Sequence, residues 1–406
     1  MMNLESPRKF AGLVQQAHQV ATEIFRPNSR KYDRAEHGYP KELDVLAALL
    51  DGMTAAGGNS GAGAAGVRRD ALQDQGNRNG SNLSTVLGAM ELCWGDVGLL
   101  LSMPRQGLGN SAIASVANEE QLARFRNRWA AMAITEPSCG SDSAAIRTTA
   151  VLDGDHYVLN GEKIYVTAGE RAELVVVWAT LDKKKGRAAI KSFVVEKGTP
   201  GFELVRLEHK LGIRASDTAA FVLKDCRVPK HNLLGDPEIN VEKGFAGVMQ
   251  TFDNTRPLVA AMAVGLTRAC LEETRTLLTK AGVVVDYLKP AAMQSTAASE
   301  FVRMQADYEA ARLLTLQAAW MADNRKPNSL QASMAKAKAG RVATEVSLKC
   351  VELAGSLGYV EGTSGHGLLE KWARDAKILD IFEGTQQIQL LIVARRLLGK
   401  TSAELK

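Results

Sequence analysis

Cysteine is scarce in this sequence, and its distribution excludes two common uses. The chain of 406 residues holds five cysteines, an odd number, and no two of them stand in CxxC spacing. A disulfide framework uses paired cysteines, and a cysteine zinc site uses closely spaced pairs. We therefore expect buried thiols in a reducing compartment, and we assign no metal ligands.

Long apolar runs are missing as well. A helix needs about 20 apolar residues to cross a bilayer, and the chain contains no uncharged apolar run of that length. Residues 1–26 lack the apolar core of a secretion signal, and residues 10–25 have the period of an amphipathic helix. We expect no membrane insertion and a cytoplasmic location, or the mitochondrial matrix for a mature eukaryotic protein.

Neither sign of charge is in large excess. With 50 basic and 45 acidic residues the formal net charge is +5, and aromatic residues make up only 5%. The basic residues are scattered and are not interleaved with aromatics, which argues against a nucleic acid partner. A small acidic ligand fits this mild positive excess, and so does no charged partner at all.

Hydrophobic patterning divides the chain into three parts and predicts an α+β fold. Apolar spacing is helical over 1–130, apart from a Gly- and Ala-rich loop at 54–84. Short Val- and Ile-rich runs between turn residues predict an all-β domain of about seven strands over 131–238, with a hairpin turn at Asn160-Gly161. Over 239–406 the helical period returns and predicts a four-helix bundle. Its expected helices are 243–280, 295–323, 329–357 and 370–400.

One match to a nucleotide-binding pattern is misleading. Gly61, Gly63 and Gly66 match GxGxxG letter for letter. That fingerprint must follow a strand and open a helix, so that its glycines bring a pyrophosphate to the helix N-terminus. Here the match follows a helical segment inside the Gly- and Ala-rich stretch, which favours a simple loop.

Five segments stand in a fixed order along the rest of the chain. Each alone has an ordinary explanation, since Thr, Ser and Gly are common in turns and an isolated Glu is usually a solvated surface residue. The segments are Thr135-Glu-Pro-Ser-Cys-Gly-Ser-Asp142, Asn160-Gly-Glu-Lys-Ile-Tyr-Val-Thr167, Lys210-Leu-Gly-Ile-Arg-Ala-Ser-Asp-Thr218, Asp253-Asn-Thr-Arg-Pro257, and Arg374-Asp-Ala-Lys-Ile378 followed by Phe382-Glu-Gly-Thr385.

As an ordered set these segments resemble the acyl-CoA dehydrogenase family, and Asp253–Pro257 is similar to its medium-chain-type members. The resemblance covers nearly the whole chain, apart from residues 54–84 and roughly 281–300. It implies a flavoprotein with an N-terminal α-helical domain (1–130), a middle β domain (131–238) and a C-terminal helical bundle (239–406). It also implies a homotetramer or dimer.

The resemblance assigns roles residue by residue. Glu383 matches the catalytic base. Substrate contacts are implied for Ser141, Asp253, Asn254, Thr255, Arg256 and Gly384. Contacts to FAD are implied for Met132, Ala133, Ile134, Thr135, Gly140, Ser141, Tyr165, Val166, Thr167, Gly355, Thr385 and Gln387.

The implied reaction is the oxidation of a fatty-acyl-CoA to the trans-2-enoyl-CoA. Glu383 would remove the α proton while the β hydride passes to flavin N5, and electron-transferring flavoprotein would be the acceptor. Two hydrogen bonds to the thioester carbonyl would stabilise the enolate, one of them from the N–H of Glu383. Some branches carry the base directly before the Arg of the Asp253–Pro257 segment, where this chain has Thr255.

The sequence departs from the family pattern in three places, one of which is about four extra residues within 360–369. Tyr165 replaces the usual Trp beside the flavin, and residues 282–290 lack the Arg-x-x-Phe-Gly segment that reaches the flavin pyrophosphate of a neighbouring subunit. A non-catalytic partner subunit of a hetero-oligomer is therefore one alternative. An acyl-CoA oxidase or a dehydrogenase of acyl-carrier-protein thioesters is another.

Overall fold

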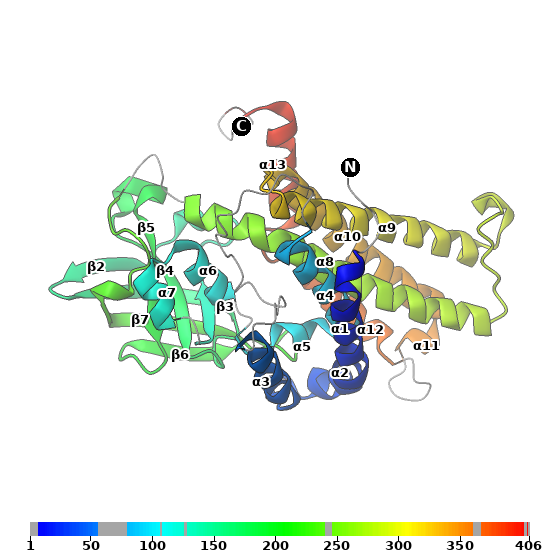
Figure 1. Ribbon diagram of the computed structural model, residues 1–406, viewed down its shortest axis with the longest axis horizontal. Coiled ribbons are helices and arrows are strands. Elements are labelled where there is room, and N and C mark those ends of the chain that lie inside the picture. Colours follow the sequence, from blue (N-terminus) through cyan, green and yellow to red (C-terminus); the bar gives the residue numbers. More distant parts are fainter. Residues whose placement is uncertain are drawn as a thin grey trace.

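The computed structural model describes residues 7–55, 79–105, 108–125, 128–239, 246–359, 367–401 and 404, with the backbone alone at 49–55 and 246–254. A sheet lies at one end of the molecule, and long helices run from it to the other end, with the N-terminal helices alongside them (Figure 1). This arrangement is the α+β layout that the sequence predicts. Most of the loop expected at 54–84, with its GxGxxG match, lies outside the described residues.

The N-terminal part is helical. Its helices are α1 (Ala11–Val20), α2 (Arg26–Arg34), α3 (Glu42–Ala55), α4 (Ser81–Gly95), α5 (Val97–Leu101), α6 (Leu108–Val116) and α7 (Glu119–Phe125), with a π-helical turn at Ala21–Phe25 between α1 and α2. Helix α4 is apolar nearly all round and mostly buried, as expected for a helix inside a core. Asp96 caps α5 by accepting a hydrogen bond from the Leu99 N–H at 2.8 Å.

Seven strands form the middle part, as the sequence predicts. They are β1 (Ala130–Ala133), β2 (Thr149–Asp153), β3 (His156–Thr167), β4 (Leu174–Thr180), β5 (Ile190–Glu196), β6 (Phe202–Leu207) and β7 (Thr218–Pro229). Their order is β1-β4-β2-β3-β7-β6, with β5 paired to β4. Strands β1 and β4 are parallel, so the sheet is mixed.

The hairpin predicted at Asn160-Gly161 is wrong. Strand β3 runs unbroken through both residues, and its hairpin with β2 turns instead at Asp153–His156, where Gly154 has a φ of 60°. At Asn160-Gly161 the register with β7 shifts by a bulge. A side chain at Gly161 would lie 2.4 Å from the Thr148 hydroxyl oxygen, so the glycine serves close packing and a bulge rather than a turn.

Long helices form the C-terminal part. They are α8 (Ala246–Lys280), α9 (Thr296–Asp323), α10 (Ser329–Ala354), α12 (Leu369–Leu379) and α13 (Gln386–Leu398), with the short α11 (Ser356–Tyr359) after α10. The fourth helix expected at 370–400 is not continuous, because the chain leaves the helical conformation between α12 and α13. Glu383 and Gly384 there have φ of 57° and 89°. No helix among the described residues is long and apolar enough to cross a membrane.

A buried ion cluster fixes α12 against the other two parts of the molecule. The Lys371 Nζ donates to Asp96 Oδ2 and to Asp375 Oδ2, each at 2.5 Å. The second oxygen of Asp375 accepts the N–H of Ile213, from the loop between β6 and β7, at 2.5 Å. Burial opposes the charge, but the two carboxylates raise the pKa of Lys371. One cluster thus joins α5, α12 and the β domain.

A second set of contacts on α12 acts beside this cluster. The Arg374 guanidinium donates to both carboxylate oxygens of Asp33, at 3.0 and 2.6 Å, and to the backbone oxygen of Leu211 at 2.8 Å. A side chain at Gly212 would lie 2.5 Å from the Arg374 carbonyl, so only glycine allows this approach. Helix α12 is therefore fixed before the chain reaches Glu383.

Replacing Lys371 should destabilise the protein strongly. Lys371→Met leaves two buried carboxylates without their cation, which we expect to cost about 3–5 kcal/mol of unfolding free energy. The exposed pair of Lys349 with Glu352, at 2.6 Å, provides the control: Lys349→Met should change stability by no more than about 0.5 kcal/mol. Urea unfolding curves of both variants test the cluster, and equal losses would contradict its role.

Candidate active site

Glu383 lies on the sharp turn between α12 and α13. Its φ of 57° is unfavourable for a residue with a side chain, so surrounding contacts must hold it. Thr385 caps α13, with its hydroxyl oxygen accepting the Ile388 N–H. A side chain at Gly384 would lie 2.5 Å from the Gln389 amide nitrogen, so a glycine is required after Glu383.

Two buried side chains hold the backbone of this turn. The Gln389 amide donates to the carbonyl oxygens of Glu383 and Gly384, at 3.0 and 3.2 Å. The Lys336 ammonium, on α10, donates to the Gly384 carbonyl at 2.8 Å. Both side chains are fully buried. The turn therefore has a fixed orientation set by two different helices.

The Glu383 carboxylate is in direct contact with α8. The Thr255 hydroxyl donates to Glu383 Oε2 at 2.8 Å. Burial raises the pKa of Glu383, while the Thr255 hydrogen bond and the charges of Arg256 and Lys336 partly offset that rise. Glu383 is thus a carboxyl group poised to take up a proton and still able to ionise.

The two cations whose charges act on Glu383 are both buried. Burial lowers the pKa of Lys336 to about 8. Arg256 is 3% exposed, and its guanidinium is 3.5 Å from the Ser333 hydroxyl on α10. Asp253 and Asn254, expected beside the substrate, lie outside the residues whose side chains are described.

The two β-domain segments expected at the flavin lie side by side. The Ile164 N–H donates to the Thr135 carbonyl at 2.9 Å. A buried ion pair joins them, with the Lys163 ammonium 2.7 Å from Glu136 Oε1. Glu136 also accepts hydrogen bonds from Thr148, through its N–H and its hydroxyl. The charged residues of both motifs therefore have structural roles.

These segments present an open face with an exposed aromatic ring. Tyr165 is 63% exposed and has a φ of 58°. Gly140 and Ser141 are exposed, and a side chain at Gly140 would meet only Thr135, at 3.9 Å. Ala133 and Val166 are fully buried in the sheet core, so only their backbone can touch a ligand. Met132, Ile134, Thr135 and Thr167 are half-buried.

Gly355 lies apart from the other predicted cofactor residues. It ends α10 with a φ of 56°, directly before α11. In Figure 1, α11 lies at the opposite end of the molecule from the strands. Thr385 and Gln387 instead follow Glu383 at the start of α13. Within one chain, Gly355 therefore lies beside α11 and away from the strands of the predicted flavin motifs.

Sequence reasoning missed Lys336 and Gln389. Lys336 falls among small residues at helical spacing, Ala332, Ala335, Ala339, Gly340 and Ala343. A lysine on such an apolar face indicates a buried cation with a specific partner. The sequence alone could therefore have predicted that Lys336 is buried. Gln389, by contrast, could not be predicted from the sequence. Its partners, the carbonyl oxygens of Glu383 and Gly384, are open to it only because a turn separates α12 from α13.

Comparison with known proteins identifies the family. The family model described as acyl-CoA dehydrogenase, middle domain, matches residues 131–226, and the one described as acyl-CoA dehydrogenase, C-terminal domain, matches residues 242–398. The short-chain-specific acyl-CoA dehydrogenase of Clostridium acetobutylicum is 34% identical over 80% of this chain and 85% of its own. The chain belongs to the acyl-CoA dehydrogenase family.

Solved structures agree with this assignment. Butyryl-CoA dehydrogenase from Megasphaera elsdenii has a TM-score of 0.81 at 30% identity, covering 98% of this chain and 100% of that one. A chain from the structure of the electron transferring flavoprotein of Acidaminococcus fermentans, described in connection with flavin-based electron bifurcation, has the same TM-score at 31% identity and the same coverage. Members of the family are flavoproteins, generally FAD-dependent, and this acyl-CoA dehydrogenase is an oxidoreductase.

Removing the Thr255 hydroxyl should make Glu383 a weaker acid. That hydroxyl donates to Glu383 and favours the ionised carboxylate, so Thr255→Val should raise the Glu383 pKa further. If the acidic limb of the pH–rate profile reports the ionisation of Glu383, that limb should then move to higher pH. Thr255→Ser keeps the donor and should leave the limb in place. An unmoved limb in Thr255→Val would show that the hydrogen bond does not tune the base.

Proposed function

We propose that this acyl-CoA dehydrogenase oxidises a short, straight-chain acyl-CoA to its trans-2-enoyl-CoA, with Glu383 as the base. The observation that carries the proposal is the Glu383 turn: a carboxyl group with a raised pKa, held by Lys336 and Gln389 on a backbone that only this environment stabilises. The two relatives named for short-chain and butyryl-CoA substrates support the chain length.

Different residues of this chain have different roles in the proposed reaction. Glu383 takes the α proton, and Thr255 holds one of its carboxylate oxygens while the other remains available. The fixed Glu383–Gly384 backbone places the Glu383 N–H for the thioester carbonyl, where a preorganised donor stabilises the developing enolate. Tyr165, the Gly140–Ser141 loop and the backbone of Met132–Thr135 and Val166–Thr167 fit FAD, with Thr385 and Gln387 as further contacts. When bound, FAD would supply the hydride acceptor.

We further propose that a second copy of the chain completes the cofactor site. Gly355 ends α10 directly before α11, and α11 lies away from the strands, among them β3, which carries Tyr165 (Figure 1). The apolar residues Leu390, Leu391, Leu397 and Leu398 of α13 are each at least 44% exposed, which suits a subunit contact. The relative from the electron transferring flavoprotein structure supports such a flavoprotein as the electron acceptor.

An anaerobic absorption experiment tests the proposed function. The purified protein, with FAD added, is mixed with acyl-CoAs of increasing chain length. Bleaching of the flavin bands that is strongest with a short chain supports the proposal. Bands that persist with every acyl-CoA, or a protein that does not bind FAD, would favour the non-catalytic partner subunit. In a separate aerobic assay, rapid oxygen consumption would indicate an acyl-CoA oxidase. Flavin bleaching only when acyl-carrier-protein thioesters replace the acyl-CoAs would indicate the other alternative.

Glu383→Gln should abolish turnover while retaining the flavin. Loss of a general base typically costs about 10²- to 10⁴-fold in rate.

The same variant should change how stability depends on pH. A raised folded-state pKa means that ionising Glu383 reduces stability as pH rises through that pKa. The melting temperature of Glu383→Gln relative to wild type should therefore increase with pH. Glu352→Gln, at an exposed carboxylate, should change neither property. Wild-type turnover in Glu383→Gln would remove Glu383 from the mechanism.

A further inference from the structure

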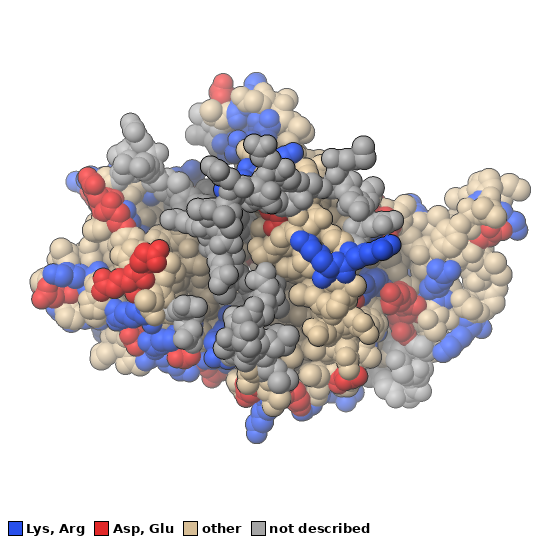
Figure 2. All heavy atoms as spheres, viewed as in Figure 1, with Lys and Arg blue, Asp and Glu red and all other residues tan. Residues whose placement is uncertain are grey.

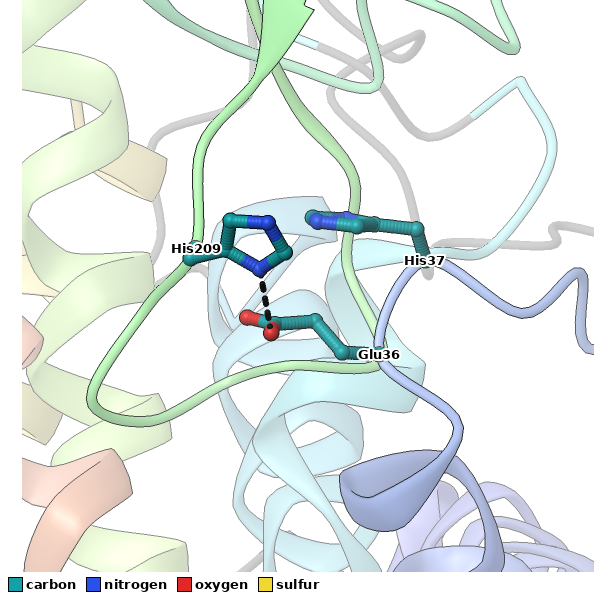
Figure 3. Close-up of side chains that lie close together, drawn as sticks. All are labelled: Glu36, His37 and His209. Carbon is teal, nitrogen blue, oxygen red and sulfur yellow. Dashed lines mark hydrogen bonds and ion pairs between the residues drawn. The ribbon is translucent and has the colours of Figure 1, made fainter.

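Two histidines and a glutamate meet where the N-terminal part contacts the β domain. Glu36 and His37 follow the end of α2, and His209 lies on the loop between β6 and β7 (Figure 3). His209 Nδ1 is 2.9 Å from Glu36 Oε2, and the two imidazole rings are 5.4 Å apart. Within the part of the chain that the structure describes, this is the one group of three potential metal ligands whose donor atoms lie within 4.8 Å of one another.

His37 is the unusual member of this group. Both of its ring nitrogens are closed to solvent and have no hydrogen-bond partner among the described residues. Its φ of 66° lies in the left-handed region, which His enters more readily than most residues other than glycine, and Arg171 holds the segment by donating to the Gly38 carbonyl at 2.9 Å. Buried polar atoms are normally paired, so an unpaired imidazole indicates a missing partner.

We propose that Glu36, His37 and His209 bind a divalent transition metal ion of the Zn²⁺ class. Two imidazoles and one carboxylate are ligands that zinc takes, with a water molecule as the fourth. At zinc–ligand distances of about 2.1 Å, tetrahedral ligands lie about 3.4 Å apart. The donor atoms of the three residues lie within 4.8 Å of one another, so rotation of the side chains would bring them to this spacing. The 85% exposed His209 side chain leaves a path from solvent.

The surroundings of the group suit this role. Glu36 Oε1 accepts the Lys210 N–H at 2.7 Å, which orients the other oxygen toward His209, as outer contacts orient the ligands of metal sites. The ammonium of Lys210 donates to the Ser216 carbonyl at 2.5 Å, and the Arg214 Nε donates to the Lys210 carbonyl at 2.8 Å.

A bound ion would connect residues 173 positions apart in sequence, so it would clamp α2 to the β domain. The chain also offers a matched control. His18 Nδ1 lies 2.9 Å from Glu91 Oε2, the same separation as in the proposed site. That pair has no second histidine, and Arg268 occupies both Glu91 oxygens at 2.7 and 2.5 Å. His18→Gln therefore removes an equivalent histidine–carboxylate pair without touching the proposed ligands.

The test is zinc binding by the full chain, measured by titration calorimetry and by metal content after desalting. Wild type and His18→Gln should retain one zinc ion per chain. Glu36→Gln and His209→Gln should each lose at least about tenfold in affinity, the scale of changes at metal sites. Zinc should raise the melting temperature of wild type and of His18→Gln only. Replacing zinc with Co²⁺ should give visible bands in these two proteins.

A further variant distinguishes loss of the zinc site from misfolding of the chain. His37→Asn keeps a residue that tolerates positive φ and removes the ring, so a normal melting temperature without zinc, together with lost zinc binding, supports the site. Equal zinc content in all the variants, or no retained zinc in wild type, would overturn the proposal. Zinc content is measured without substrate or flavin, so the outcome is independent of the proposed dehydrogenation.

Discussion

The position of the catalytic candidate depends on the buried ammonium of Lys371. It neutralises Asp96 and Asp375, which belong to different parts of the chain, and Asp375 in turn accepts the Ile213 N–H of the β domain. An ion pair removed from water is favourable only when each charge has its partners. The cluster therefore specifies one arrangement of α5, α12 and the β6–β7 loop. Since Glu383 follows α12 by four residues, that arrangement also places the base.

Opposing effects act on the pKa of the Glu383 carboxyl group: burial raises it, and neighbouring donors and cations lower it. A base that attacks a weak carbon acid needs a raised pKa, and burial supplies it, but the same burial would leave the carboxyl protonated and inactive. The Thr255 hydroxyl and the cations Arg256 and Lys336 favour the ionised form. Lys336 serves twice, because its ammonium also fixes the Gly384 carbonyl. The turn geometry and the acidity of Glu383 are consequently linked.

The sequence predicted the helical and strand-rich parts because their apolar periods differ, and local periods depend on local residues. It failed where distant contacts decide the conformation. Asn160-Gly161 has the composition of a hairpin turn, yet packing against Thr148 makes it a bulge inside β3. Residues 370–400 have a helical period, yet Gln389 and Lys336 stabilise a break at Glu383. His37 and His209 carried no signal, because only the fold brings them together.

Figure 2 shows basic and acidic side chains interspersed on the described residues of one face. Internal contacts say more about how the parts of the molecule are joined. The segment Lys210–Thr218 illustrates this. Its Lys210 N–H binds Glu36, its Ile213 N–H binds Asp375, and its Asp217 pairs with Arg171. Ile213 itself has a φ of 47°, in the left-handed region. This segment, one of those that resemble the family, thus joins the N-terminal part, the β domain and the C-terminal part of the molecule. A match there is evidence for the fold, whereas the evidence for catalysis rests on Glu383 and the contacts that hold it.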